Sequence, residues 1–139
     1  MTYPICGYLP MNIGTSLLQI FRPVSHAKQQ WAKAIVADPS TQRSQVAKAL
    51  LTVNSSYGFK ANGTNAFRSQ VRLEAFVSAN SMTMDRNSAK WLVQDVRNLQ
   101  KDLKIQEKSA WANAGVPGST NMQRAEALRA AVAALRGLY

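Results

Sequence analysis

The chain has 139 residues, of which 46% are hydrophobic and 17% are charged, a composition that fits one globular domain and excludes a disordered tail. The 17 Lys and Arg residues outnumber the 7 Asp and Glu residues, and the formal net charge of +10 indicates a polyanionic partner, most simply nucleic acid. The single Cys and single His exclude a disulfide framework and the usual zinc sites, and no apolar run reaches the roughly 20 residues of a membrane helix.

The positive charge is concentrated in the first half of the chain. Residues 1–73 carry eight basic side chains and one acidic side chain, Asp38, whereas residues 74–139 carry nine basic and six acidic side chains. Because so few acidic groups neutralise it, the first half predicts a phosphate-facing surface whose binding weakens steeply with salt. The alternative is an ordinary solvated surface with an excess of lysine.

The first predicted elements are a hairpin and a short helix. Residues 5–24 hold an apolar stretch, a cluster of turn formers and a run of strand formers, which together predict a β-hairpin. Over residues 25–37, Trp31 and Ile35 recur at helical spacing and predict a short helix or a helical turn. Asp38-Pro39 ends this segment, because the residue before proline is disfavoured in a helix.

The next two segments predict a second hairpin if the first of them is a strand. Residues 43–54 fit a strand by alternation, although three apolar residues in them would equally line one face of a helix. Residues 67–75 alternate between apolar and polar side chains, which predicts a strand with one polar, mostly basic face. Asn62-Gly63 between them is typical of a tight hairpin turn.

The second half is predicted to be more helical. A stripe of apolar residues at spacings of three and four predicts a helix over residues 87–104. An Ala-rich amphipathic pattern predicts another helix over residues 119–138, in which Thr120 and Gln123 fit a capping box.

No catalytic centre is expected. His26 has no carboxylate or nucleophile near it in the sequence, Cys6 lies in an apolar run, and Asp95 and Asp102 are interspersed with Lys and Arg, as expected for charge balance. There is no Gly-rich phosphate loop and no cluster of metal ligands. We therefore expect no enzymatic activity, no cofactor or metal and no small-molecule substrate.

The polar face of the predicted sheet is the candidate RNA-binding site. Side chains two residues apart on a strand are roughly 7 Å apart, which is similar to the spacing of phosphates along single-stranded RNA. A surface of Arg, Lys, Thr, Gln and Asn suits RNA, whereas the alternative is an ordinary solvent-exposed sheet face. The candidate RNA-binding residues are Lys48, Thr52, Asn54, Arg68, Gln70 and Arg72. Alanine at either arginine is expected to weaken RNA binding and to leave the fold intact.

Several short motifs occur in a characteristic order. Asn12-Ile13-Gly14-Thr15 precedes a predicted strand that ends at Pro23-Val24-Ser25, Trp31 follows, and Arg43-Ser44-Gln45 leads into the next predicted strand. A helix with Ser and Thr at its start, over residues 119–138, closes the chain. This order resembles the coat proteins of the small single-stranded RNA phages, the leviviruses.

The resemblance implies an α+β fold with an N-terminal β-hairpin, an antiparallel β-sheet and C-terminal helices that pack across a dimer. Residues 1–139 would form a single coat-protein domain, and dimers would assemble into a closed icosahedral shell. The partners would be copies of the chain and a single-stranded RNA genome, with no membrane. The six candidate residues match the family's RNA-facing strand positions. The protein would be located in the virion and, during assembly, in the host cytoplasm.

A mainly α-helical fold is the alternative, with four helices and a small sheet, and it resembles the coat proteins of rod-shaped plant RNA viruses. The four helices would lie near residues 25–37, 41–54, 87–104 and 119–138. RNA would then be held by helix-borne arginines such as Arg97, Arg124 or Arg129. Two other functions remain open: a small basic cellular protein that binds RNA or DNA, and a basic adaptor that binds an acidic protein assembly.

Overall fold

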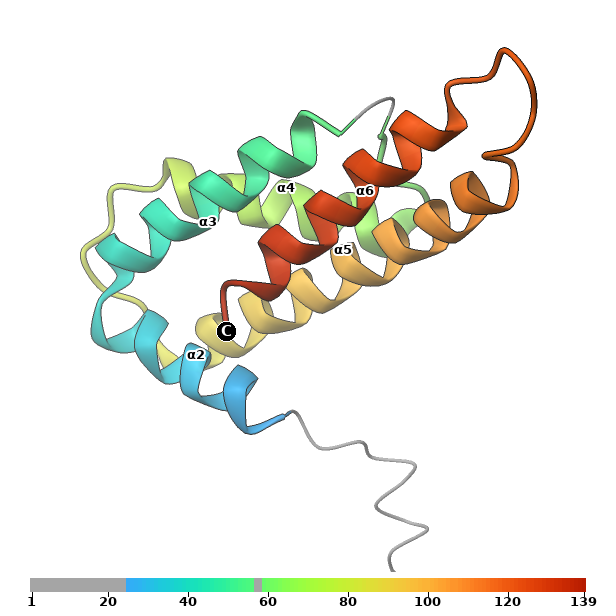
Figure 1. Cartoon of the computed structure of the whole chain (residues 1–139). Helices are drawn as coiled ribbons and strands as arrows, with labels where there is room; N and C mark the ends of the chain where they lie inside the picture. Colours follow the sequence, from blue (N-terminus) through green and yellow to red (C-terminus); the bar gives the residue numbers. More distant parts are fainter. Residues whose placement is uncertain (1–24, 57–58) are drawn as a thin grey trace, which may run out of the picture.

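The computed structural model describes residues 25–56 and 59–139, and every regular element within these ranges is an α-helix. The helices, shown in Figure 1, are α2 (His26–Ala37), α3 (Pro39–Asn54), α4 (Thr64–Ser78), α5 (Arg86–Ala112) and α6 (Asn121–Arg136). The predicted α+β fold is therefore wrong, because the described ranges contain no strand. The mainly α-helical alternative predicted four of these helices. It also predicted a small sheet, which the described residues do not contain. The hairpin predicted over residues 5–24 lies outside the described residues.

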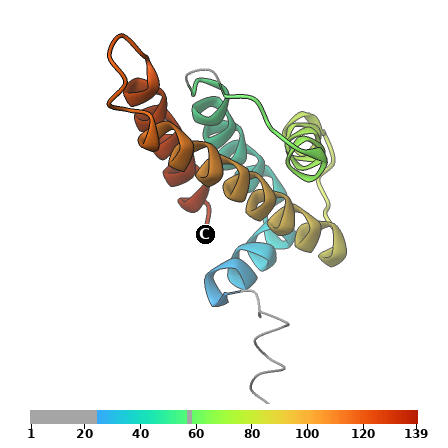
Figure 2. The ribbon, with the colours of Figure 1, turned by 90° about the vertical axis from the view of Figure 1, so that its right-hand side faces the viewer.

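Helices α3 to α6 form an antiparallel four-helix bundle. Each helix contacts the next one in the chain, and α6 closes the ring by packing on α3. Figure 2 shows α5 running the length of the bundle with α6 on one side and α4 on the other. Helix α2 lies at one end of the bundle, where it contacts α3 and α5 (Figures 1 and 2). None of the described helices is both long and apolar enough to cross a membrane.

The core is built from apolar side chains at spacings of three and four on each helix. On α5 these include Leu92, Val96, Leu99 and Leu103, all of them buried. This confirms the helix predicted over residues 87–104, which in the structure extends over two further turns. The other large side chains that are fully buried in the core are Ile35, Val46, Val53, Leu73, Leu128 and Leu135.

Residues 43–54 belong to a helix, which corrects the predicted strand. Val46, Leu50 and Val53 are buried, and they lie on one side of α3 because a helix turns by about 100° per residue. The helix begins at Pro39. Proline is favourable at the first position of a helix, because the backbone N–H that it lacks would have no partner within the helix there. Asp38 caps it by accepting a hydrogen bond from the backbone N–H of Thr41 (3.2 Å).

The strand predicted over residues 67–75 is likewise wrong, because this segment lies in α4. Of the apolar residues in the alternation, Phe67 and Val71 are 60% and 47% exposed, and Leu73 is fully buried. The buried positions of α4 are Ala66, Ser69, Leu73 and Phe76, which follow the helical spacing. A helix places these four residues on one continuous face against the core. The segment therefore forms a helix, although its apolar and polar residues alternate as in a strand.

Two other turn and capping predictions are corrected. Gly63 has a φ of +88°, a value that favours glycine, but it is the residue before α4 and does not form a hairpin turn. Thr120 is the N-cap of α6, as the capping box implied, yet its side chain makes no capping hydrogen bond.

Candidate nucleic-acid interface

The six candidate residues do not share one face, because residues two apart on a helix point in nearly opposite directions. Arg68 and Arg72 are four apart and lie on the same side of α4. Gln70 points instead toward α3, where its Nε2 donates a hydrogen bond to Oδ1 of Asn54 (2.9 Å). The structure thus brings four of the six residues together in two pairs, and the predicted sheet surface does not exist within the described residues.

The remaining two candidates, Lys48 and Thr52, lie on α3 and take no part in the Gln70–Asn54 contact. Lys48 is exposed, and Thr52 is half-buried one turn further along. The backbone carbonyl of Thr52 accepts a hydrogen bond from the hydroxyl of Ser56 (3.1 Å). The helix turns Asn54 away from Thr52 and toward α4, which corrects the prediction that the three residues continue one surface.

Arg72 forms an ion pair with a buried carboxylate. Its Nη2 lies 2.7 Å from Oδ1 of Asp95, and its Nε donates to both carboxylate oxygens (3.0 and 3.1 Å). The Asp95 side chain is 1% exposed, whereas that of Arg72 is 48% exposed. These hydrogen bonds raise the pKa of Arg72 above its ordinary value. Ser69 also donates to Asp95 (3.0 Å), so this cluster joins α4 to α5.

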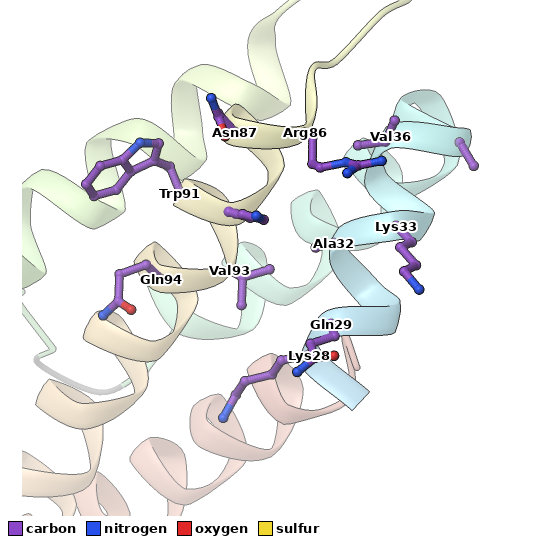
Figure 3. A pocket seen from close by; sticks show the side chains of 12 residues that line it. Lys28, Gln29, Ala32, Lys33, Val36, Arg86, Asn87, Trp91, Val93 and Gln94 are labelled. Atoms are coloured by element: carbon purple, nitrogen blue, oxygen red, sulfur yellow. The ribbon is translucent and has the colours of Figure 1, made fainter. Parts of the chain in front are cut away.

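A concave surface with a different set of basic residues lies between α2 and the first turns of α5. This groove has a volume of about 1110 Å³ and is shown in Figure 3. Its lining has four basic side chains and no acidic one, and we call it the cationic groove. It is lined by Lys28, Gln29, Ala32, Lys33, Val36, Ala37, Arg86, Asn87, Lys90, Trp91, Val93 and Gln94.

The basic groups of the cationic groove are not neutralised by acidic side chains within the described part of the chain. Lys33, Arg86 and Lys90 form no ion pair or hydrogen bond there, and the ammonium group of Lys28 lies 4.9 Å from the centre of the Tyr139 ring. The groove therefore presents positive charge to solvent.

The two aspartates that adjoin the groove in sequence are committed to helix caps. Asp38 accepts hydrogen bonds from the hydroxyl and backbone N–H of Thr41, which lower the pKa of its carboxyl group. Asp85 accepts from the backbone N–H of Ser88 (2.8 Å) and from its hydroxyl (3.1 Å), and its pKa is lowered for the same reason.

A second hollow, of about 590 Å³, adjoins the cationic groove on the α4 side of α5. Arg43 and Arg72 contribute to its lining, and Trp91 belongs to the walls of both hollows. Arg43 is held in place by two backbone carbonyls, since its Nε donates to Phe76 and its Nη2 donates to Ser81, each at 2.8 Å. Trp91 is 63% exposed and lies between the cationic groove and this second hollow, whose lining also includes Asp95, the ion-pair partner of Arg72.

The arginines of the α-helical alternative lie away from this region or make internal contacts. Arg124 donates to Oε1 of Gln106 (2.6 Å), and Arg97 donates to Oε1 of Gln94 (3.4 Å). The guanidinium of Arg129 lies 5.9 Å from the centre of the Trp111 ring. None of the three lines either hollow.

The cationic groove was not found from the sequence, because it is formed by helices that are about fifty residues apart in the chain. Its only local sign is the pair Lys90-Trp91, with Arg86 one turn earlier, on a helix that the apolar stripe predicted. Within the described residues, no group of three or more His, Cys, Asp or Glu side chains is placed to hold a metal ion.

The fold and site define a helical bundle with a cationic groove at one end. Comparison of the chain with protein-family models, with curated proteins and with solved structures finds no match. The resemblance to virus coat proteins therefore stays a prediction, and the function is inferred from the groove itself.

Proposed function

We propose that this protein binds nucleic acid through the cationic groove. The observation that carries the proposal is that four basic side chains from two helices line one concave surface, in which the described residues place no acidic side chain. Phosphate groups are the anions that Lys and Arg most commonly bind along an extended polymer, and a groove accommodates a polymer better than a flat surface does.

Three of these basic residues are the main candidates for phosphate contacts. Lys33, Arg86 and Lys90 have no competing partner within the described residues, so they lose no internal interaction when they bind a phosphate. Arg86 and Lys90 are one turn apart on α5, and Lys33 contributes to the lining from α2. Figure 3 shows Arg86 extending from α5 toward α2. Binding would release counterions from the nucleic acid and would therefore weaken as salt rises.

Neutralising these three residues tests the proposal. In the variant Lys33→Gln/Arg86→Gln/Lys90→Gln, we expect weaker binding of a labelled single-stranded oligonucleotide, measured by fluorescence anisotropy from about 50 to 200 mM salt. Each lost phosphate contact lowers the slope of log K against log salt by about 0.7, so the slope is expected to fall by about 2.

The matched control removes the same charge elsewhere on the same helix. Lys101, Lys104 and Lys108 are exposed on α5 and do not line the groove, so replacing all three by Gln lowers the net charge equally. We expect this control to bind more tightly than the groove variant. Equal losses in the two variants would contradict the proposal, because they would show that only net charge matters.

A second proposal is that the chain assembles with copies of itself into a shell that packages RNA. It rests on the coat-protein resemblance, and one observation favours it. Leu51, Phe67 and Val71 are 68%, 60% and 47% exposed, and they lie on α3 and α4, two helices that pack together. Apolar side chains exposed in this number on adjoining helices are suited to contacts between subunits.

A further inference from the structure

We infer that the nucleic acid bound by this protein is single-stranded and that one unpaired base stacks on the indole of Trp91. This inference rests on the proposed function, and it adds the form of nucleic acid that the cationic groove selects. It follows from the state of Trp91 and from its position between the two hollows.

Trp91 differs from the other two tryptophans in having no internal partner among the described residues. Trp31 is buried, and its indole N–H donates to Oε1 of Gln42 (2.8 Å). Trp111 donates to Oε2 of Glu107 (3.0 Å) and lies beneath the guanidinium of Arg129. Trp91 is 63% exposed and makes no hydrogen bond or ring contact within the described ranges. A large aromatic surface is thus left open to solvent, which is unfavourable unless a ligand covers it.

The position of Trp91 places basic groups on both of its sides. Arg86 and Lys90 line the hollow toward α2 and have no ion-pair partner among the described residues, whereas Arg72 lines the hollow toward α4 together with its ion-pair partner Asp95. Figure 3 shows the indole extending from α5 away from α2. A strand whose phosphates contact Arg86 and Lys90, and which continues from the cationic groove toward α4, would pass over the indole, where one of its bases can stack.

This arrangement distinguishes single strands from duplexes. In a single strand the bases are free to leave their neighbours and to stack on an aromatic side chain, and every base has a ring face to offer. In a duplex the bases are stacked on one another and paired, so the indole has no ring face to contact. An acidic peptide could satisfy the basic groups, but its carboxylates would leave the indole uncovered.

The test compares three variants on several ligands. Trp91→Ala removes the indole, Trp91→Phe keeps a smaller aromatic ring, and Trp111→Ala removes a partly exposed tryptophan from the same helix outside the groove. Each is titrated with labelled oligouridine, with an RNA duplex of the same length and with polyglutamate as competitor. Stacking of a base on an aromatic side chain contributes about 1–3 kcal/mol, so Trp91→Ala is expected to weaken oligouridine binding by about tenfold.

The expected pattern has three further parts. Duplex binding is unchanged in Trp91→Ala, Trp91→Phe retains most of the affinity for oligouridine, and Trp111→Ala resembles the wild type. Oligouridine also quenches the tryptophan fluorescence of the wild type, and this quenching is lost in Trp91→Phe.

The outcomes separate this inference from the proposed function. If the wild type binds oligouridine and Trp91→Ala binds it equally well, or if the variant loses duplex binding to the same extent, the stacking inference is wrong and the proposed function stands. If the wild type binds neither nucleic acid, both are wrong. If polyglutamate displaces oligouridine at equal charge concentration, the groove is a site for acidic proteins and both are again wrong.

Discussion

Arg72 has a structural role that an exposed position on a polar face would not suggest. Its guanidinium is half exposed, yet it supplies the only ion pair of the Asp95 carboxylate within the described residues. A carboxylate that is almost fully buried needs such a partner, because burial without one carries a large desolvation cost. The earlier expectation that alanine at position 72 leaves the fold intact is therefore revised.

We expect Arg72→Ala to lower the free energy of unfolding by about 2 kcal/mol. Loss of one partner from a fully buried pair costs roughly 3–5 kcal/mol, and the value is smaller here because Arg72 is half exposed and Ser69 still donates to Asp95. Urea denaturation followed by circular dichroism measures the change.

Arg68→Ala is the matched control, because Arg68 is exposed one turn away on the same helix and has no partner within the described residues. Its substitution is expected to change the free energy of unfolding by less than about 0.5 kcal/mol. Similar values for the two variants would show that the Asp95 contact contributes nothing to stability.

Residue spacing could predict part of the candidate site. Arg68 and Arg72 share a side under either interpretation, since residues four apart lie together both on a strand and on a helix. Gln70 changes sides between the two, and the alternating pattern predicted the strand, which is wrong. Trp91 was not recognised, because an exposed tryptophan and a core tryptophan occupy similar positions in an amphipathic pattern until the neighbouring helices are known.

At the scale of the element, two helices begin with an aspartate cap beside the cationic groove. The hydrogen bonds to Thr41 and Ser88 favour the charged forms of Asp38 and Asp85, so the pKa of each carboxyl group is lower in the folded protein than in the unfolded chain. The stabilisation from these caps is fully present above the unfolded pKa, about 3.9, and is lost as the pH falls through the folded value.

Asn is also a good N-cap but does not titrate, so Asp38→Asn/Asp85→Asn isolates the charge. We expect the thermal unfolding midpoint of the wild type to fall more steeply than that of the variant as the pH is lowered from 5 toward the folded pKa. Parallel profiles would show that the two carboxyl groups titrate alike in the folded and unfolded chains.

The helices were predictable where apolar residues at helical spacing met a clear terminus. The stripe on α5 and the end of α2 at Asp38-Pro39 are examples, because the apolar spacing and the local terminus favour the same structure there. Helix α4 was mistaken for a strand because two of its exposed side chains, Phe67 and Val71, are apolar, and because a buried position is held by a polar residue, Ser69. Ser69 is satisfied by Asp95 and Asn98 of α5, partners that only the folded structure brings near it.

At the scale of the whole molecule, the acidic groups are largely used inside the fold. All four aspartates accept hydrogen bonds from neighbouring groups: two cap helices, Asp95 pairs with Arg72, and Asp102 accepts from the backbone N–H of Asn62 (3.0 Å). Glu107 accepts from Trp111. These hydrogen bonds leave the carboxylates charged, and the formal net charge of +10, which already counts them, gives an attractive field for polyanions at the surface.

Self-association is the property that separates a coat protein from a small cellular nucleic-acid-binding protein. If the chain is a coat protein, size-exclusion chromatography is expected to give particles rich in nucleic acid, seen as shells or rods by electron microscopy. Leu51→Asp/Phe67→Asp is then expected to give small species, because it places charges on the exposed apolar residues of α3 and α4.

Met82→Asp is the control for this experiment, since Met82 is 77% exposed in the segment between α4 and α5. It is expected to assemble as the wild type does. A wild type that elutes as a small species with bound nucleic acid would contradict the coat-protein proposal and leave the nucleic-acid-binding proposal standing.

The connection between α2 and α3 consists of one non-helical residue, Asp38, and this restricts how the cationic groove can open. A connection of one residue does not let one helix slide past the other. Any movement of α2 relative to α3 is therefore a rotation about the φ and ψ angles of Asp38. The carboxylate at this hinge also caps α3, and a wider groove therefore strains that cap. We therefore expect occupancy of the groove to be linked to fraying of the first turn of α3, and hydrogen exchange at the N–H of Thr41 would report a ligand bound in the neighbouring groove.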